Sequence, residues 1–219
     1  MRIINLETEK EVAKMKDFFW TKQDFEVFEI EGLTPRMTAL QQLIQPKLQD
    51  LGEHFASYFS ISLGEEFFPH VAKHARRTIN PPNDTWVAFA PNKRGYKMLP
   101  HFQIGMWDSH IFIVVAVIYE VPTKMAIAQQ LLQQEDILHA LPKDFVVSGN
   151  HMEKPAFPVA EETTALLQRM TQIKKAEFLI GRHISKETAI TLSHSDFKQF
   201  VEETFEALLP IYRIMQEAH

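Results

Sequence analysis

The middle of the chain carries a pattern of apolar and polar positions that predicts three neighbouring strands. Residues 101–107 alternate between apolar and polar side chains, and this period of two is typical of a strand. The nine uncharged residues from Ile111 to Tyr119 indicate a strand over His110–Tyr119 that is buried on both faces. The short turn Asp108-Ser109 joins these two runs, and Thr85–Ala90 is predicted to be the strand before them. Together they predict an antiparallel meander.

A strand and a long helix are predicted before this meander. Residues 25–30 alternate and predict the strand. Thr34 followed by Pro35 is a helix start signal. The apolar residues after it recur every three or four positions, as on one helix face; they are Met37, Leu40, Ile44, Leu48, Leu51, Phe55 and Phe59. Pro46 lies inside this stretch, so we expect it to kink the helix or split it in two.

A last helix is predicted at the C-terminal end, with Ser195 as its cap and a bend at Pro210. Its apolar stripe includes Phe205 and Leu208, and we expect both to be buried against the sheet. Further predicted elements are an extended segment over 70–78, helices over 123–140 and 160–173, and strands over 145–148 and 177–184. Runs of strands flanked by long helices predict an α+β fold, with one antiparallel sheet packed against helices.

Composition agrees with a globular protein, since 45% of the 219 residues are hydrophobic and 23% are charged. We expect a polar extension over residues 1–16 and a single α+β domain over residues 17–219. The chain has no cysteine, which excludes disulfides and thiolate chemistry and fits a cytoplasmic protein. The charged N-terminus does not resemble a signal peptide. The nine-residue apolar run is far shorter than the ~20 residues of a membrane-spanning helix, so no membrane partner is expected.

Basic residues are concentrated between His70 and His101. This segment has six Lys or Arg residues and one acid, giving +5, in a chain whose net charge is −5. We interpret it as an anion-binding pocket on the polar face of the sheet, because Arg side chains suit carboxylate and phosphate. The candidate ligand-binding residues are Lys73, His74, Arg76, Arg77, Trp86, Lys93, Arg94, Tyr96, Lys97, His101 and Gln103. The alternative is a solvated basic edge that balances the acidic remainder.

The topology predicts that five of these side chains converge, namely Arg76, Arg77, Arg94, Lys97 and His101. Trp86 and Tyr96 can stack on a planar ligand. The small residues Ala88, Ala90 and Gly105 can leave a hollow on the same face, or they can admit a close-packed helix.

Other kinds of site are weaker interpretations. His70 and His74 have metal-ligand spacing and His101 is a possible third ligand, but the neighbouring cations repel a metal ion, so no metal is predicted. The chain has no Gly-rich phosphate loop, Gly-x-Gly-x-x-Gly or Gly-x-Ser-x-Gly motif, and no cofactor is predicted. The acidic pairs Glu65-Glu66 and Glu161-Glu162 fit a solvated turn and the first turn of a helix better than a glycosidase.

Three functional hypotheses remain open at this level. The first is a binding protein for a small anionic or phosphorylated ligand. The second is an enzyme that uses the same pocket, with His74 or His101 as acid or base. The third, a nucleic-acid-binding protein, is the weakest because the net charge is negative. No oligomeric state is predicted.

Two long runs, residues 70–90 and 92–107, resemble the YktB-like family of Gram-positive bacteria, a domain of unknown function. Residues 25–33, 181–184 and 202–205 resemble it too, so the likeness extends from about residue 20 to the C-terminus. The resemblance implies a fold similar to the TATA-binding protein, with a curved antiparallel sheet and helices. It implies neither DNA binding nor any catalytic residue.

Overall fold

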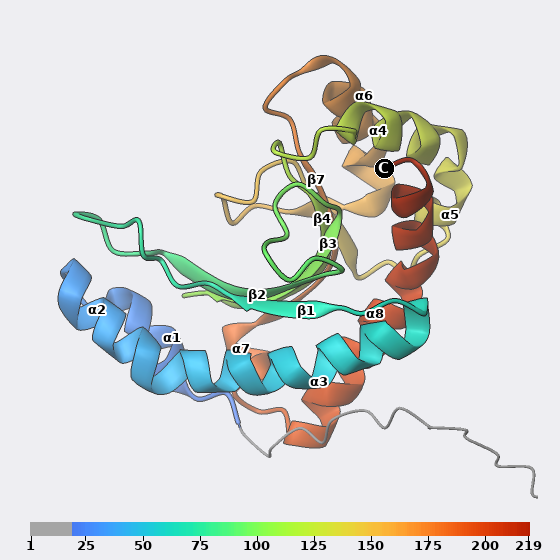
Figure 1. The fold of residues 1–219 in the computed structure, drawn as a ribbon. Coiled ribbons are helices and arrows are strands. Elements are labelled where there is room, and N and C mark those ends of the chain that lie inside the picture. The colour runs from blue at the N-terminus through green and yellow to red at the C-terminus, as the bar shows by residue number, and fades with distance from the viewer. Residues whose placement is uncertain (1–18) are drawn as a thin grey trace, which may run out of the picture.

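The computed structural model describes residues 19–219, and its centre is a seven-stranded sheet in the order β1-β2-β3-β4-β7-β5-β6. Every neighbouring pair in this sheet is antiparallel. The strands are β1 (Phe68–Val71), β2 (Asp84–Ala90), β3 (His101–Trp107), β4 (His110–Val117), β5 (Phe145–Ser148), β6 (Phe157–Pro158) and β7 (Phe178–Ser185). One sheet with helices packed against it (Figure 1) confirms the α+β prediction.

The predicted meander is confirmed as β2, β3 and β4, which pair side by side. The strand predicted over 101–107 has the predicted bounds, and Asp108 and Ser109 form the turn after it. β2 begins one residue before the predicted strand, at Asp84, and β4 ends at Val117. The period of two, together with the β-branched content of β4, is therefore enough to place these strands.

Helices precede, interrupt and follow the sheet. They are α1 (Lys22–Glu26), η1 (Val27–Glu29), α2 (Leu33–Ala39), η2 (Leu40–Ile44), α3 (Gln45–Leu63), α4 (Lys124–Gln133), α5 (Glu135–His139), α6 (Val159–Gln172), α7 (Lys186–Ala189) and α8 (His194–Glu217). Figure 1 shows α3 running along β1 and β2, while α8 contacts β4 and β7. α4 packs against α6, and α6 contacts β5 and β7.

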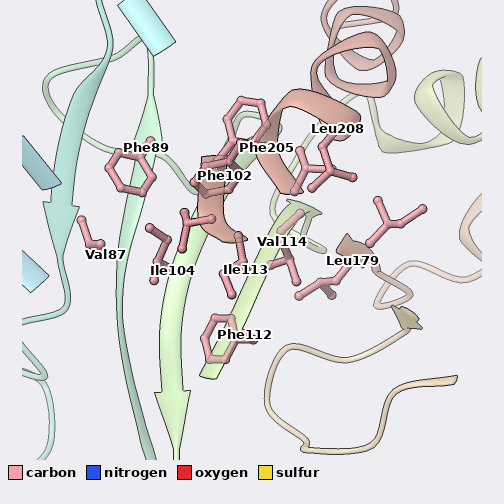
Figure 2. Close-up of a cluster of buried hydrophobic side chains, with 14 of the residues drawn as sticks. Val87, Phe89, Phe102, Ile104, Phe112, Ile113, Val114, Leu179, Phe205 and Leu208 are labelled. Carbon is pink, nitrogen blue, oxygen red and sulfur yellow. The ribbon is translucent and has the colours of Figure 1, made fainter. Parts of the chain in front are cut away.

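The core lies between the sheet and the helices α3 and α8. Figure 2 shows Phe205 and Leu208 directed from α8 toward Phe102 and its neighbours on the sheet. Both residues of α8 have no exposed surface, which confirms their predicted burial. Phe59 of α3 stacks on Phe102 with ring centroids 4.0 Å apart, and Phe205 meets the same ring at 5.4 Å. These contacts fix one face of the sheet against the helices.

The strand predicted over residues 25–30 is wrong, because this segment forms α1 and η1. Thr21 caps α1 in a capping box with Asp24, and the carboxylate of Asp24 also meets Lys47 of α3 at 2.5 Å. Phe25 and Phe28 are both buried. A spacing of three residues places both side chains on one face of a helix, while the alternation of apolar residues is equally compatible with a strand. The capping box of Thr21 and Asp24 favours the helix.

The first long helix is not split at Pro46, which stands at the second position of α3. The wide π-helical turn η2 directly precedes it. Proline has no N–H and its ring crowds the carbonyl four residues earlier, so a wider turn accommodates it without ending the helix. The start also differs from the prediction, since the N-cap is Gly32 and Thr34 lies inside α2.

Other predicted boundaries shift. Of the segment predicted to be extended over 70–78, only residues 70 and 71 lie in a strand, at the end of β1. The helix predicted over 123–140 is divided into α4 and α5. The last helix is capped by Ser193, whose hydroxyl accepts the Asp196 N–H at 3.1 Å, so the expected cap at Ser195 is wrong. The predicted extension over residues 1–16 lies outside the described residues. Between residues 19 and 219, no helix is long and apolar enough to cross a membrane.

Candidate functional site

The sheet face opposite α3 and α8, called the pocket face below, carries a pocket of about 140 Å³. Four aromatic side chains line it: Trp86, Tyr96, Trp107 and Phe112. A cavity of ~150 Å³ holds one benzene molecule. The pocket therefore matches a ligand built around one six-membered ring.

The strand register sets the aromatic side of the pocket. Trp86 of β2 lies opposite Gly105 of β3, which lies opposite Phe112 of β4. A Cβ atom at Gly105 would stand 2.2 Å from Cζ of Phe112 and 2.7 Å from Cβ of Trp86. The missing side chain thus lets the Phe112 ring extend across β3 toward Trp86. The hollow expected above Gly105 is filled by this ring.

A buried carboxyl group lies in the same pocket. Asp84 begins β2 opposite Trp107 and is 9% exposed. Within residues 19–219, no other side chain donates a hydrogen bond to its carboxylate. Burial raises the pKa of Asp84 to about 6, and the charges of His151 and Arg77 offset only part of that effect. The pocket therefore contains a buried acid that no other described side chain pairs with directly.

His101 lies beside Gln103 on the pocket face and is not among the residues that line the pocket. Its Nδ1–H donates to the carbonyl of Leu99 at 2.7 Å, and its Nε2 accepts from the Gln103 amide at 2.8 Å. Burial lowers the pKa of His101 to about 4, so the ring is neutral near pH 7. Both ring nitrogens are occupied, while Gln103 lines the pocket and its carbonyl oxygen remains an acceptor.

The loop over residues 91–100 folds back over the pocket face. The Trp86 indole N–H donates to the Tyr96 hydroxyl at 2.9 Å, and the Tyr96 ring meets His101 edge to face at 4.7 Å. Lys97 from the same loop lines the pocket and forms an ion pair with Glu120 at 3.3 Å. These contacts hold Tyr96 at the pocket wall.

Two stacked histidines form another part of the lining. The rings of His110 on β4 and His183 on β7 stack with centroids 4.4 Å apart. Burial lowers the pKa of His110 to about 4 and that of His183 to about 3, with help from Lys154 and from His110 respectively. In the described part of the chain, the buried Nε2 of His110 has no hydrogen-bond partner. Both rings are therefore neutral near pH 7, which allows them to stack without repulsion.

The loop between β5 and β6, residues 149–156, covers the pocket. Glu177 anchors it by accepting the backbone N–H of His151 at 2.8 Å and the ring Nδ1–H at 2.7 Å. Burial alone would raise the pKa of Glu177, but these bonds, together with one from the Tyr119 N–H, hold it below its ordinary value. Lys154 and Asp108 form a second anchor at 2.5 Å. The loop is thus tied down at two points.

Four of the candidates from the sequence line this pocket, namely Trp86, Tyr96, Lys97 and Gln103. His101 contacts Gln103 and Tyr96 but does not line the pocket. The other six are not among the lining residues: Lys73, His74, Arg76, Arg77, Lys93 and Arg94. The connection between β1 and β2 carries the first four of these, and the loop at the other end of β2 carries the last two. The structure therefore does not gather the arginines in the pocket.

The histidines considered as metal ligands have other partners. His70 Nε2 meets the carbonyl of Asn92 at 2.9 Å, and His74 Nε2 meets the hydroxyl of Thr85 at 3.2 Å. Among residues 19–219, no three His, Asp or Glu side chains are placed to hold a metal ion.

Sequence reasoning missed Asp84, His110, His151 and His183 as pocket residues. A signal existed for His110, because it shares the strand alternation of Phe112 and Val114. His151 carries no such signal, since only the contact with Glu177, 26 positions away, places it.

The fold and the site define an α+β protein with a loop-covered pocket on the face of the sheet that the helices leave free. The chain belongs to the family described as "Domain of unknown function (DUF1054)", whose model matches residues 20–212. This confirms the family resemblance, while the fold similar to the TATA-binding protein stays a prediction.

Bacterial relatives cover nearly the whole chain. A UPF0637 protein from Lysinibacillus sphaericus (strain C3-41) is 56% identical over 200 residues, which are 90% of this chain and 95% of the relative. A UPF0637 protein from Exiguobacterium sibiricum is 48% identical over 200 residues, covering 90% and 98%. A third, from Bacillus velezensis, is 47% identical over 208 residues, covering 93% and 99%.

Proposed function

We propose that this protein binds a small, flat and largely apolar organic molecule in the pocket on its sheet. The observation that carries the proposal is an aromatic lining of Trp86, Tyr96, Trp107 and Phe112 around about 140 Å³, completed on one side by residues 150–156. Ligand sites are typically apolar hollows with a few polar groups that fix orientation. Asp84, Gln103 and the stacked histidines supply those groups.

The lining favours a flat ring over a phosphate. Lys97 and Lys154 are the two lysines in the pocket, and each is paired with an acid. Arg76 and Arg94, expected to hold an anion, are not among the lining residues. An anion would have to compete for lysines that already have partners.

The second candidate function is an enzyme that uses the same pocket, and the observation that favours it is the position of His151. Both nitrogens of His101 are occupied, and His74 is not part of the lining. His151 lines the pocket, and Glu177 holds its Nδ1, which leaves Nε2 for proton transfer. An enzyme would convert a bound fragment, seen as new signals in the fragment's NMR spectrum. Conversion would stop in His151→Gln while binding remained.

Fragment binding tests the proposal. Single-ring fragments should quench tryptophan fluorescence, because Trp86 and Trp107 are two of the three tryptophans and both line the pocket. Phe112→Ala should weaken binding, since it removes the ring that extends across β3. Met125→Ala changes an exposed side chain on α4 and serves as the control. Equal affinities in Phe112→Ala and the parent would contradict the proposed site.

A cytoplasmic location remains a prediction from the sequence, which contains no cysteine.

A further inference from the structure

We propose that the ligand of this pocket is a planar cation with an N–H edge, such as an amidinium, a guanidinium or a protonated amino-heterocycle, and that Asp84 binds that edge. The inference rests on the proposed function and adds the charge and hydrogen-bonding pattern of the ligand.

The first argument is the free-energy cost of burying the Asp84 carboxylate. Its side chain is on the pocket face opposite Trp107 and is 9% exposed. Within the described residues, no side chain donates a hydrogen bond to the carboxylate. A buried charge without a partner is destabilising. A cationic ligand removes this cost, because a planar N–H edge can donate two parallel hydrogen bonds to one carboxylate.

The second argument is the aromatic surround. Trp86, Trp107 and Phe112 line the same pocket as Asp84, and aromatic faces attract cations. Lys154 already lies 5.9 Å from the centre of the Trp107 ring. The indole N–H of Trp86 is committed to Tyr96, so it is not available as a donor for an anionic ligand.

The third argument concerns the basic side chains around the pocket. Lys97 is paired with Glu120, Lys154 with Asp108 and His151 with Glu177. Arg77 acts on Asp84 through its charge, but it is half-buried outside the lining and makes no ion pair with Asp84. Both lysines and His151 are therefore matched by an acid. Two acids of the lining have no side-chain partner among the described residues, Glu153 and Asp84, and of these Glu153 is exposed while Asp84 is buried.

Three ring compounds of nearly the same shape test the charge directly. Benzamidine is cationic, benzamide is neutral and benzoate is anionic, and each contains one six-membered ring that suits about 140 Å³. Their affinities are measured at pH 7.5 by calorimetry or ligand-detected NMR. We expect benzamidine to bind at least ~10-fold more tightly than benzamide, since hydrogen bonds between two charged groups are stronger than those to a neutral amide, and benzoate to bind most weakly.

Asp84→Asn should remove the preference, so that benzamidine and benzamide bind equally. Asp136→Asn removes one negative charge from an exposed position on α5, and this control should keep the order of the three affinities. Thermal unfolding of both variants verifies that they are folded.

The outcomes separate the two proposals. If benzoate or benzamide binds as tightly as benzamidine, or if Asp84→Asn keeps the preference, the cationic ligand is wrong while a flat-ring site stands. If none of the three compounds binds the parent protein, the proposed function fails and this inference fails with it.

Discussion

The side-chain amide of Gln103 donates a hydrogen bond of 2.8 Å to Nε2 of His101. The carbonyl of Leu99 can only accept, so Nδ1 of the same ring carries the proton in their 2.7 Å contact. His101 is therefore a neutral ring with one tautomer. This pair orients Gln103 on the pocket face, where its carbonyl oxygen is left for a ligand.

The neutral state of His101 gives a prediction for the pH dependence of stability. The pKa is lowered from 6.5 to about 4 by burial, so the unfolded chain takes up a proton at a higher pH than the folded protein. The resulting stability is present above pH 6.5 and is lost as the pH falls toward 4. Because His101→Asn lacks this group, the parent should lose about 3 kcal/mol more than the variant between pH 7.5 and pH 4. Urea unfolding measures both curves, and parallel curves would contradict the neutral buried ring.

Asp84 should behave in the opposite way in the protein without ligand. Its pKa is raised from 3.8 to about 6 by burial, so the folded state binds the proton first as the pH falls. The ionised carboxyl destabilises the fold fully above pH 6, and most of this cost disappears as the pH falls to 4. The stability of Asp84→Asn relative to the parent should therefore be greater at pH 7.5 than at pH 4, by about 2 kcal/mol. A difference that does not change with pH would show that Asp84 ionises normally.

Gly105→Ala should disturb both the sheet and the pocket. The added Cβ would lie 2.2 Å from the ring of Phe112 and 2.7 Å from the backbone oxygen of Thr85. The ring can move but the backbone oxygen cannot, so we expect a loss of about 1–3 kcal/mol and weaker fragment binding. Gly95→Ala is the matched control, because a Cβ added at Gly95 would meet no atom within 4 Å; its effect should stay within ~0.5 kcal/mol. Equal unfolding free energies for the two variants would rule out the close contact.

Leu208→Ala tests the packing of α8 on the sheet. Leu208 has no exposed surface, and removing a buried leucine side chain leaves a cavity that costs about 2–5 kcal/mol. Met125→Ala at an exposed site on α4 should change stability by less than ~0.5 kcal/mol. A loss well under ~1 kcal/mol for Leu208→Ala in chemical denaturation would contradict this packing.

The sequence alone determined the central meander, the α+β class and the buried stripe of the last helix. In each case the information is local, because a period of two or of 3.6 within one segment specifies both the element and its inward face. The same parity places Trp86, Gln103 and Trp107 on one face of the sheet. The strand pattern alone was thus sufficient to predict that these aromatic and polar side chains share one face of the sheet.

Only the tertiary structure decided which charged groups meet. Arg76 lies in the connection before β2 and Arg94 lies in the loop after it, so the length of β2 separates the two side chains. His151 reaches the pocket through Glu177, and the partner of Lys154 is Asp108 in the turn after β3. Such contacts depend on loop paths and on the order of strands in the sheet, which no local periodicity encodes. The buried state of Asp84 has the same origin, because its surroundings come from strands and loops distant in the chain.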